Sequence, residues 1–134
     1  MKRSLWFFIG ISGLVIALAA SSEVASQQDN QLSPHEVHSQ HQQGSVLIVD
    51  VRTPAEFSAS HIEGALSVPL SQVAARAGEV GQRAGARPIV LYCRSGRRAG
   101  IAEGLLRERG VQNIFHLQGQ LAGWQAAQLP TSSH

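Results

Sequence analysis

Cysteine is almost absent from this sequence: Cys93 is the only one among 134 residues. A single thiol excludes any disulfide within the chain. In an oxidising compartment a lone thiol is also a liability unless the protein uses it. The count therefore directs attention to Cys93 as a candidate reactive group.

The sequence also lacks an excess of charge of either sign. The formal net charge is +2, and Lys2 and Arg3 lie in a segment that we expect to be removed. Without these two residues, nine of the eleven basic residues remain, against nine acidic residues. This balance gives no basis for nucleic-acid binding through overall charge, so positive charge is informative only where it clusters. With 43% apolar and 15% charged residues, the chain is typical of one globular domain.

A long apolar run is missing as well. A membrane-spanning helix needs ~20 apolar residues, and the apolar stretch at residues 5–20 is shorter. It follows Lys2 and Arg3 and contains an Ala-x-Ala sequence at 17–19, which is typical of a cleaved export signal. We therefore expect residues 1–19 to be a signal peptide and the protein to be periplasmic, without stable membrane insertion. An uncleaved N-terminal membrane anchor is the alternative.

The rest of the chain alternates between helical and extended patterns. After a polar tether at 20–32, a capping box with Ser33 and Glu36 predicts a helix over 33–43. Further helices are expected from Thr53, over 71–80, over 97–109 and over 121–127. Strands are expected over 45–51, 65–68, 88–92 and 113–117. This alternation predicts one α/β sandwich around a mostly parallel sheet at 33–130, followed by a tail at 131–134.

The strongest chemical signal is the segment that follows the strand at 88–92. It places Cys93 at the carboxyl end of a buried strand, where ligand sites of open α/β sheets lie. Loop N–H groups, the start of the next helix and three arginines all favour an anion there, and hence thiolate over thiol. An inert buried cysteine is the alternative, but arginines and glycine so close by do not suit it. The candidate anion-binding residues are Arg94, Ser95, Gly96, Arg97, Arg98 and Ala99.

Three parts of the sequence have a pattern known from one family, and the first part consists of two segments. Residues 50–57 fit D-x-R-x-x-x-E-[FY], and residues 61–69 fit H-I-x-G-A-x-x-x-P. Residues 93–98 are similar to a six-residue active-site loop, and residues 117–124 are similar to L-x-G-G-x-x-x-W. Together they resemble the rhodanese family, especially its single-domain exported thiosulfate sulfurtransferases.

Two positions depart from the family pattern. Ser60 and Gln120 stand where the family usually has glycine. We expect both to lie away from the Cys93 loop, where they affect local turns and leave the chemistry intact.

The resemblance implies a three-layer sandwich, with helices on both faces of the sheet, and a two-step sulfur transfer. The Cys93 thiolate would take the outer sulfur of thiosulfate or a similar small-molecule donor as a persulfide, and cyanide or a thiol acceptor would remove it. Backbone amides of residues 94–99 would hold the terminal sulfur. Arg97 and Arg98 would attract the donor, with Arg94 a weaker candidate. No cofactor and no metal are implied.

Other functions stay open. The protein is alternatively a persulfide carrier or redox module for a partner protein that accepts the sulfur. A cysteine phosphatase needs arginine six positions after the nucleophile, but that position is Ala99. Arsenate reduction has little support.

The remaining polar candidates are interpreted as structural. Asp50, Arg52 and Glu56 are expected to supply an arginine–glutamate brace between strand and helix. His61 is expected to pack its turn, and Trp124 to anchor the core. Three histidines of the first expected helix are spaced three apart: His35, His38 and His41. We expect them on a solvated helix face. We do not expect a metal site there, because no acidic partner completes a ligand set.

Overall fold

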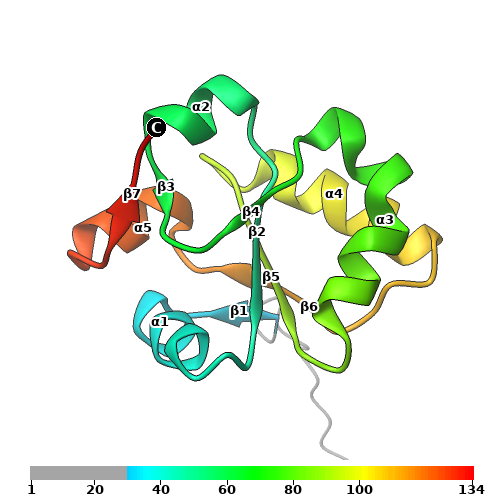
Figure 1. Ribbon diagram of the computed structural model, residues 1–134, viewed down its shortest axis with the longest axis horizontal. Helices are drawn as coiled ribbons and strands as arrows, with labels where there is room; N and C mark the ends of the chain where they lie inside the picture. The colour runs from blue at the N-terminus through cyan, green and yellow to red at the C-terminus, as the bar shows by residue number, and fades with distance from the viewer. Residues whose placement is uncertain (1–29) are drawn as a thin grey trace, which may run out of the picture.

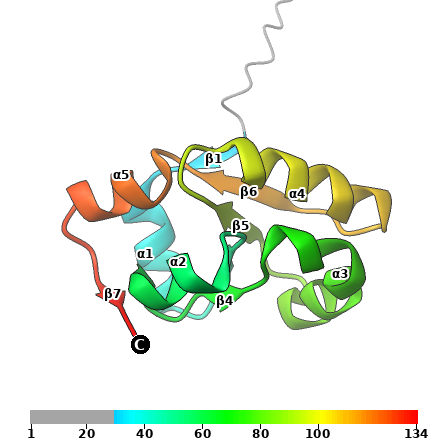
Figure 2. The same cartoon turned by 90° about the horizontal axis from the view of Figure 1, so that it is seen from above.

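A computed structural model describes residues 30–134, which form a three-layer α/β sandwich (Figures 1 and 2). The expected signal peptide at 1–19 and most of the expected tether at 20–32 lie outside the described residues. Within 30–134, no helix has the length and apolar character needed to cross a bilayer.

Five parallel strands make the central sheet, in the order β1-β6-β5-β2-β4. The central strands β2 and β5 pair along their whole length, so that Asp50 ends opposite Tyr92. Because the strands are parallel, their carboxyl ends share one edge, and Cys93 follows directly after Tyr92 at that edge. The strands are β1 (Gln31–Leu32), β2 (Leu47–Asp50), β4 (Leu66–Ser67), β5 (Ile89–Tyr92) and β6 (Ile114–Leu117).

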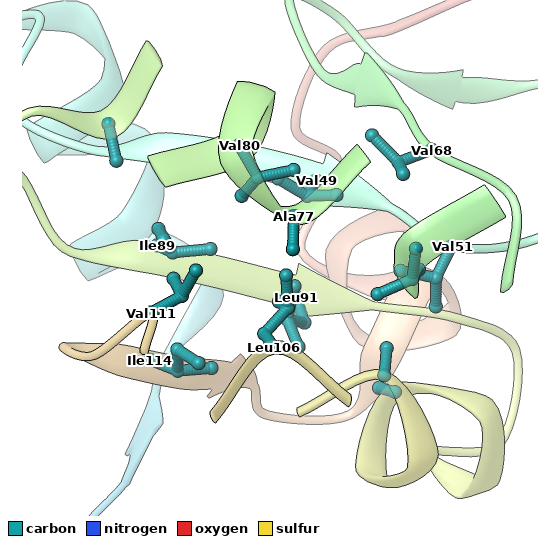
Figure 3. Close-up of a cluster of buried hydrophobic side chains, with 14 of the residues drawn as sticks. Val49, Val51, Val68, Ala77, Val80, Ile89, Leu91, Leu106, Val111 and Ile114 are labelled. Carbon is teal, nitrogen blue, oxygen red and sulfur yellow. The ribbon is translucent and has the colours of Figure 1, made fainter. Parts of the chain in front are cut away.

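Alternate side chains of β5 point to opposite faces of the sheet and feed two cores. Ile89 and Leu91 belong to the core under α3 (Leu70–Ala84) and α4 (Arg97–Glu108), which Figure 3 shows. Val90 and Tyr92 belong to the core under α1 (Pro34–Gln42) and α5 (Gln120–Ala126). Helices therefore cover both faces of the sheet (Figure 1). The predicted fold class is confirmed.

Two helices begin where the sequence predicts. Ser33 Oγ accepts the Glu36 N–H at 3.2 Å, and the Glu36 carboxylate accepts the Ser33 N–H at 3.0 Å. Thr53 and Glu56 repeat this reciprocal capping at the start of α2 (Pro54–Ala59). Such caps satisfy backbone donors that a helix leaves free at its first turn.

One helix is longer than predicted. The segment expected over 71–80 is helical from Leu70 to Ala84. Glycine lowers helix propensity, and Gly78 and Gly81 lie in its second half. Burial outweighs this cost, because one face of the helix packs on the sheet through Val73, Ala77, Val80 and Ala84.

Three short strands carry no pattern that predicts them. Gln31–Leu32, expected in the tether, forms β1 and pairs with β6. Thr131–Ser132, expected in the tail, forms β7 and pairs antiparallel with β3 (His61–Ile62). Two-residue strands are too short to show alternation, so only the tertiary fold defines them. Strand pairing thus includes residues 31–32 and 131–132, which lie just outside the expected 33–130.

Candidate active site

The thiol of Cys93 lies at the carboxyl edge of the sheet and is fully buried. Its Sγ accepts a hydrogen bond from the Gly96 N–H at 3.0 Å. Gly96 is the N-cap of α4 with φ 96°, a left-handed conformation that glycine adopts without a steric cost. A backbone donor at the start of a helix stabilises negative charge on the acceptor that it contacts.

The three loop arginines differ in their surroundings. Arg94 and Arg97 are exposed, and within residues 30–134 neither forms an ion pair with a carboxylate. Arg98 instead donates to both oxygens of Glu56, with Nη1···Oε1 2.7 Å and Nη2···Oε2 3.0 Å. The charge of Arg98 is therefore compensated inside the protein, whereas those of Arg94 and Arg97 have no carboxylate partner within residues 30–134.

Glu56 connects α2 to this loop. Its carboxylate accepts hydrogen bonds from Arg98 and from the N–H and hydroxyl of Thr53. The hydrogen bonds from Arg98, reinforced by those from Thr53, lower the pKa of Glu56 to about 2. Glu56 is thus ionised at neutral pH and has no proton to give to a substrate.

A second, separate ion pair is buried at the end of β2. Arg52 Nη2 lies 2.7 Å from Asp50 Oδ2, with exposed side-chain fractions of 6% and 0%. The same nitrogen donates to the Ser60 carbonyl at 2.6 Å. The expected brace between Arg52 and Glu56 is therefore wrong: Arg52 is engaged by Asp50 and Ser60, and the glutamate pairs with Arg98. Arg52 ties the end of β2 to the end of α2.

The histidine at 61 packs its turn, as the sequence indicates. Its ring stacks on Phe57 with centroids 3.6 Å apart, and Nδ1 lies 2.7 Å from the Phe57 carbonyl oxygen. His61 is only 4% exposed. Its ring therefore supports the connection between α2 and β3.

The histidines of α1 are not a uniformly solvated face, which corrects that expectation. His35 is exposed, but His38 lies edge-on to Trp124 at 5.7 Å, and His41 Nε2 lies 3.1 Å from the Glu63 carbonyl oxygen. Two of the three thus pack against the fold. In the described part of the chain, no group of three or more His, Cys, Asp or Glu side chains is placed to hold a metal. Trp124 is 1% exposed and lies in the core.

Two cavities flank the Cys93 loop. One, of about 320 Å³, is lined by Arg94 from the loop, by Glu56 and Ser60, and by residues of α5. The other, of about 360 Å³, is mainly apolar and is lined by Arg98 together with Leu70 and other residues at the starts of α2 and α3. The Glu56–Arg98 pair stands between them, since one partner lines each cavity.

Comparison with known proteins identifies the family. Residues 33–127 match the Rhodanese-like domain family. The chain belongs to this family. The Alr3790 protein from Anabaena sp. has a similar structure, with a TM-score of 0.70 and 28% identity, and the match covers 77% of this chain and 82% of that one.

Curated relatives of this rhodanese-like domain differ in what is known of them. The uncharacterized protein slr1261 of Synechocystis sp. is 40% identical over 80% of this chain and 58% of its own length. A protein named sulfurtransferase from Allochromatium vinosum is 36% identical over 63% of this chain and 77% of its own. The putative sulfur carrier protein YrkF of Bacillus subtilis is 30% identical over 60% of this chain and 42% of its own. The match thus spans little more than half of slr1261.

Both family departures lie closer to the loop than expected. Ser60 lines the same cavity as Arg94. The Gln120 side chain contacts the Cys93 loop itself: its Oε1 accepts the Cys93 N–H at 2.9 Å. The expectation that these residues lie away from the loop is wrong, because the end of β6 meets the end of β5 at the edge where the loop begins. The one indication of the Gln120 contact in the sequence was a glutamine at a position where the family usually has glycine.

Proposed function

We propose that this rhodanese-like domain is a sulfurtransferase that moves a sulfane sulfur from thiosulfate, or a similar donor, to cyanide or a thiol through a persulfide on Cys93. The observation that carries the proposal is the hydrogen bond from the Gly96 N–H to Cys93 Sγ at the start of α4. This donor is placed to stabilise a thiolate before reaction and an anionic persulfide after it.

The reaction proceeds in two displacements on sulfur. The Cys93 thiolate attacks the outer sulfur of thiosulfate; a new S–S bond forms, the donor S–S bond breaks, and sulfite leaves with the electron pair. Cyanide then attacks the terminal sulfur of the persulfide, and the Cys93 thiolate leaves as thiocyanate is released. No proton is transferred in either step, which agrees with a site whose nearby Glu56 is locked in an ion pair.

Charge around the loop favours a small anionic donor. Arg94 and Arg97 are exposed, and within residues 30–134 both lack a carboxylate partner. Because the resting thiol is enclosed, we infer that the donor enters from the cavity that Arg94 lines. Thiosulfate carries two negative charges and fits this environment better than an uncharged donor does.

The experiment that tests the proposal is a thiosulfate:cyanide transfer assay on the purified protein and on Cys93→Ser. We expect thiocyanate formation by the wild type, none by the folded variant, and one added sulfur atom in the mass of the thiosulfate-treated wild type. A serine variant that retains transfer would overturn the assignment of Cys93.

A persulfide carrier is the second candidate, and the similarity to the putative sulfur carrier YrkF favours it. A carrier forms the same persulfide but passes it to a partner protein. The two functions separate in the same assay, because a carrier gains one sulfur atom per chain and shows no turnover with cyanide or small thiols.

A cysteine phosphatase is disfavoured by the loop. The sixth position after Cys93 is Ala99, which is fully buried in the core against the sheet. The residue at this position therefore supplies no guanidinium, which phosphate transfer requires there. We expect no hydrolysis of aryl phosphates by the wild type.

A further inference from the structure

Gln120 has a backbone conformation that side-chain-bearing residues rarely adopt. Its φ is 56°, and it directly follows Gly119, whose φ is 78°. Within residues 30–134, only two other non-glycine residues have positive φ, Asn113 and Gln128. Such a conformation persists where surrounding interactions compensate for it, and it often marks a functional site.

The side chain of Gln120 supplies those interactions at the ends of β5 and β6. Its Oε1 accepts the Cys93 N–H at 2.9 Å, and its Nε2 donates to the Leu117 carbonyl at 3.0 Å. The last paired residues of these strands are Leu91 and His116. The carboxamide thus extends the ladder by one peptide-like unit and satisfies two backbone groups that the separating strands leave free.

The same carboxamide lies against the other end of the loop. A Cβ atom placed on Gly96 would lie 3.5 Å from Gln120 Nε2 and 3.8 Å from its Cδ. Gln120 therefore lies beside Gly96, where an added Cβ would reach contact distance, and it bonds to Cys93. Gly96 is the donor and Cys93 the acceptor of the hydrogen bond to Sγ.

We propose that Gln120 is a positioning residue that holds Cys93 and Gly96 in the arrangement that stabilises the sulfur anion. It acts through the loop backbone and not on the reacting atoms. The effect of Gln120 on sulfur transfer rests on the function proposed above. The effect of Gln120 on the reactivity of the thiol does not. Glycine, usual in the family at this position, would leave the Cys93 N–H and the Leu117 carbonyl to water.

The test uses two substitutions of Gln120 and one matched control. Gln120→Gly removes the carboxamide and relieves the unfavourable φ. Gln120→Met keeps the size and the unfavourable φ but removes both hydrogen bonds. Gln128→Gly relieves a φ of 57° at an exposed residue that follows α5, away from the loop.

The readout is the pH profile of Cys93 alkylation by iodoacetamide, measured beside the free energy of unfolding. Both Gln120 variants should move the midpoint of the profile to higher pH by about 0.3 to 1 unit, a twofold to tenfold loss of thiolate that matches a weakened hydrogen bond. Gln120→Gly should be more stable than Gln120→Met, and Gln128→Gly should keep the wild-type profile. A residue that served stability alone would change unfolding without moving this midpoint.

The groups that set charge at the sulfur are the same in every variant, so a moved midpoint reports on the loop. They come from the loop, from β2, from the connection after β2 and from α2: Arg94, Arg97, Arg98, Asp50, Arg52 and Glu56. A wild-type midpoint in either Gln120 variant would overturn the proposal. Alkylation involves no sulfur donor or acceptor, so a wild type without sulfur transfer would defeat the proposed function and leave this result standing.

Discussion

Arg98 and Glu56 form a two-point ion pair that joins the start of α4 to α2, with N···O distances of 2.7 and 3.0 Å. The two residues are 42 positions apart in the sequence. Through this pair α2 supports the Cys93 loop, since Arg98 lies two residues after Gly96, the donor to Cys93 Sγ. An arginine expected to bind substrate thus has a structural partner.

This division among the loop arginines predicts that Arg97, which has no carboxylate partner in residues 30–134, contributes to donor binding. Arg97→Ala should raise the KM for thiosulfate about tenfold. This change corresponds to the loss of a charge-assisted hydrogen bond that contributes roughly 1.5 kcal/mol. The KM for an uncharged sulfane-sulfur donor should change little. Steady-state kinetics with both donors provide the measurement. Arg109→Ala, at the other end of α4, is the matched control and should change neither KM.

Arg98→Ala should affect the same kinetics less. Because Glu56 already compensates its charge, its loss should raise the KM for thiosulfate less than the loss of Arg97. It should instead lower stability by freeing the Glu56 carboxylate. An unchanged thiosulfate KM in Arg97→Ala would show that Arg97 does not contribute to donor binding.

The Glu56–Arg98 pair also predicts a specific pH dependence of stability. The pKa of Glu56 is lowered to about 2, chiefly by the hydrogen bonds from Arg98. A lowered pKa stabilises the fold fully above the unfolded value of roughly 4.3, and this contribution is lost as the pH falls towards 2. Glu56→Gln should therefore lower the free energy of unfolding at pH 7 by about 1 kcal/mol, the scale of a partly exposed pair.

Urea unfolding between pH 7 and pH 2 measures this difference. Glutamine can replace glutamate in the capping box, so Gln at 56 leaves the start of α2 intact. The gap between wild type and variant should close as the pH falls through the interval from about 4.3 to 2. Glu63→Gln, at an exposed residue, should show no gap at any pH. A gap that stayed constant with pH would mean that the charge of Glu56 contributes nothing.

Much of the fold follows from local sequence because its determinants are close in the chain. The capping pairs Ser33–Glu36 and Thr53–Glu56 lie within one helical turn, and they begin helices where predicted. The buried run ending at Tyr92 becomes a central strand, because such runs need a sheet covered on both faces.

The errors concern contacts between residues distant in sequence. Cys93 was identifiable from its loop. The partner of Arg98, however, depends on how α2 and the start of α4 are placed relative to each other in the fold. The position of Gln120 depends on where β5 and β6 end. Gln120 and Cys93, which the hydrogen bond joins, are 27 positions apart in the sequence. Side-chain pairing of this kind requires the tertiary fold, which no spacing rule supplies.

The N-terminal segment carries a prediction about location. We propose that residues 1–19 direct export to the periplasm, because Lys2, Arg3 and the apolar stretch at 5–20 precede an Ala-x-Ala sequence. Protein expressed in bacteria should be recovered from the periplasmic fraction with an N-terminus near Ala20. N-terminal sequencing of the fractions checks this. An intact Met1 in the membrane pellet would favour the anchor instead.

The Asp50–Arg52 pair should be the polar contact most sensitive to substitution. Arg52→Met leaves the carboxylate of Asp50 fully buried without its partner, and Asp50→Asn leaves the guanidinium 6% exposed without its counter-charge. Each single change should cost about 3–5 kcal/mol of stability, because an unpaired buried charge keeps its desolvation cost. Urea unfolding at pH 7 measures it, with Arg83→Met in the exposed Arg83–Glu79 pair as the control, expected within about 1 kcal/mol of the wild type.

The double variant Asp50→Asn/Arg52→Met completes the cycle. Removing both charges removes the desolvation cost of both, so the double variant should be destabilised by less than the sum of the two single changes. The lost hydrogen bond to the Ser60 carbonyl should remain as a cost in both Arg52 variants, since that oxygen accepts from Arg52 Nη2 at 2.6 Å. Strict additivity would show that the two residues act independently, and that the pair is not what holds the end of β2 against the end of α2.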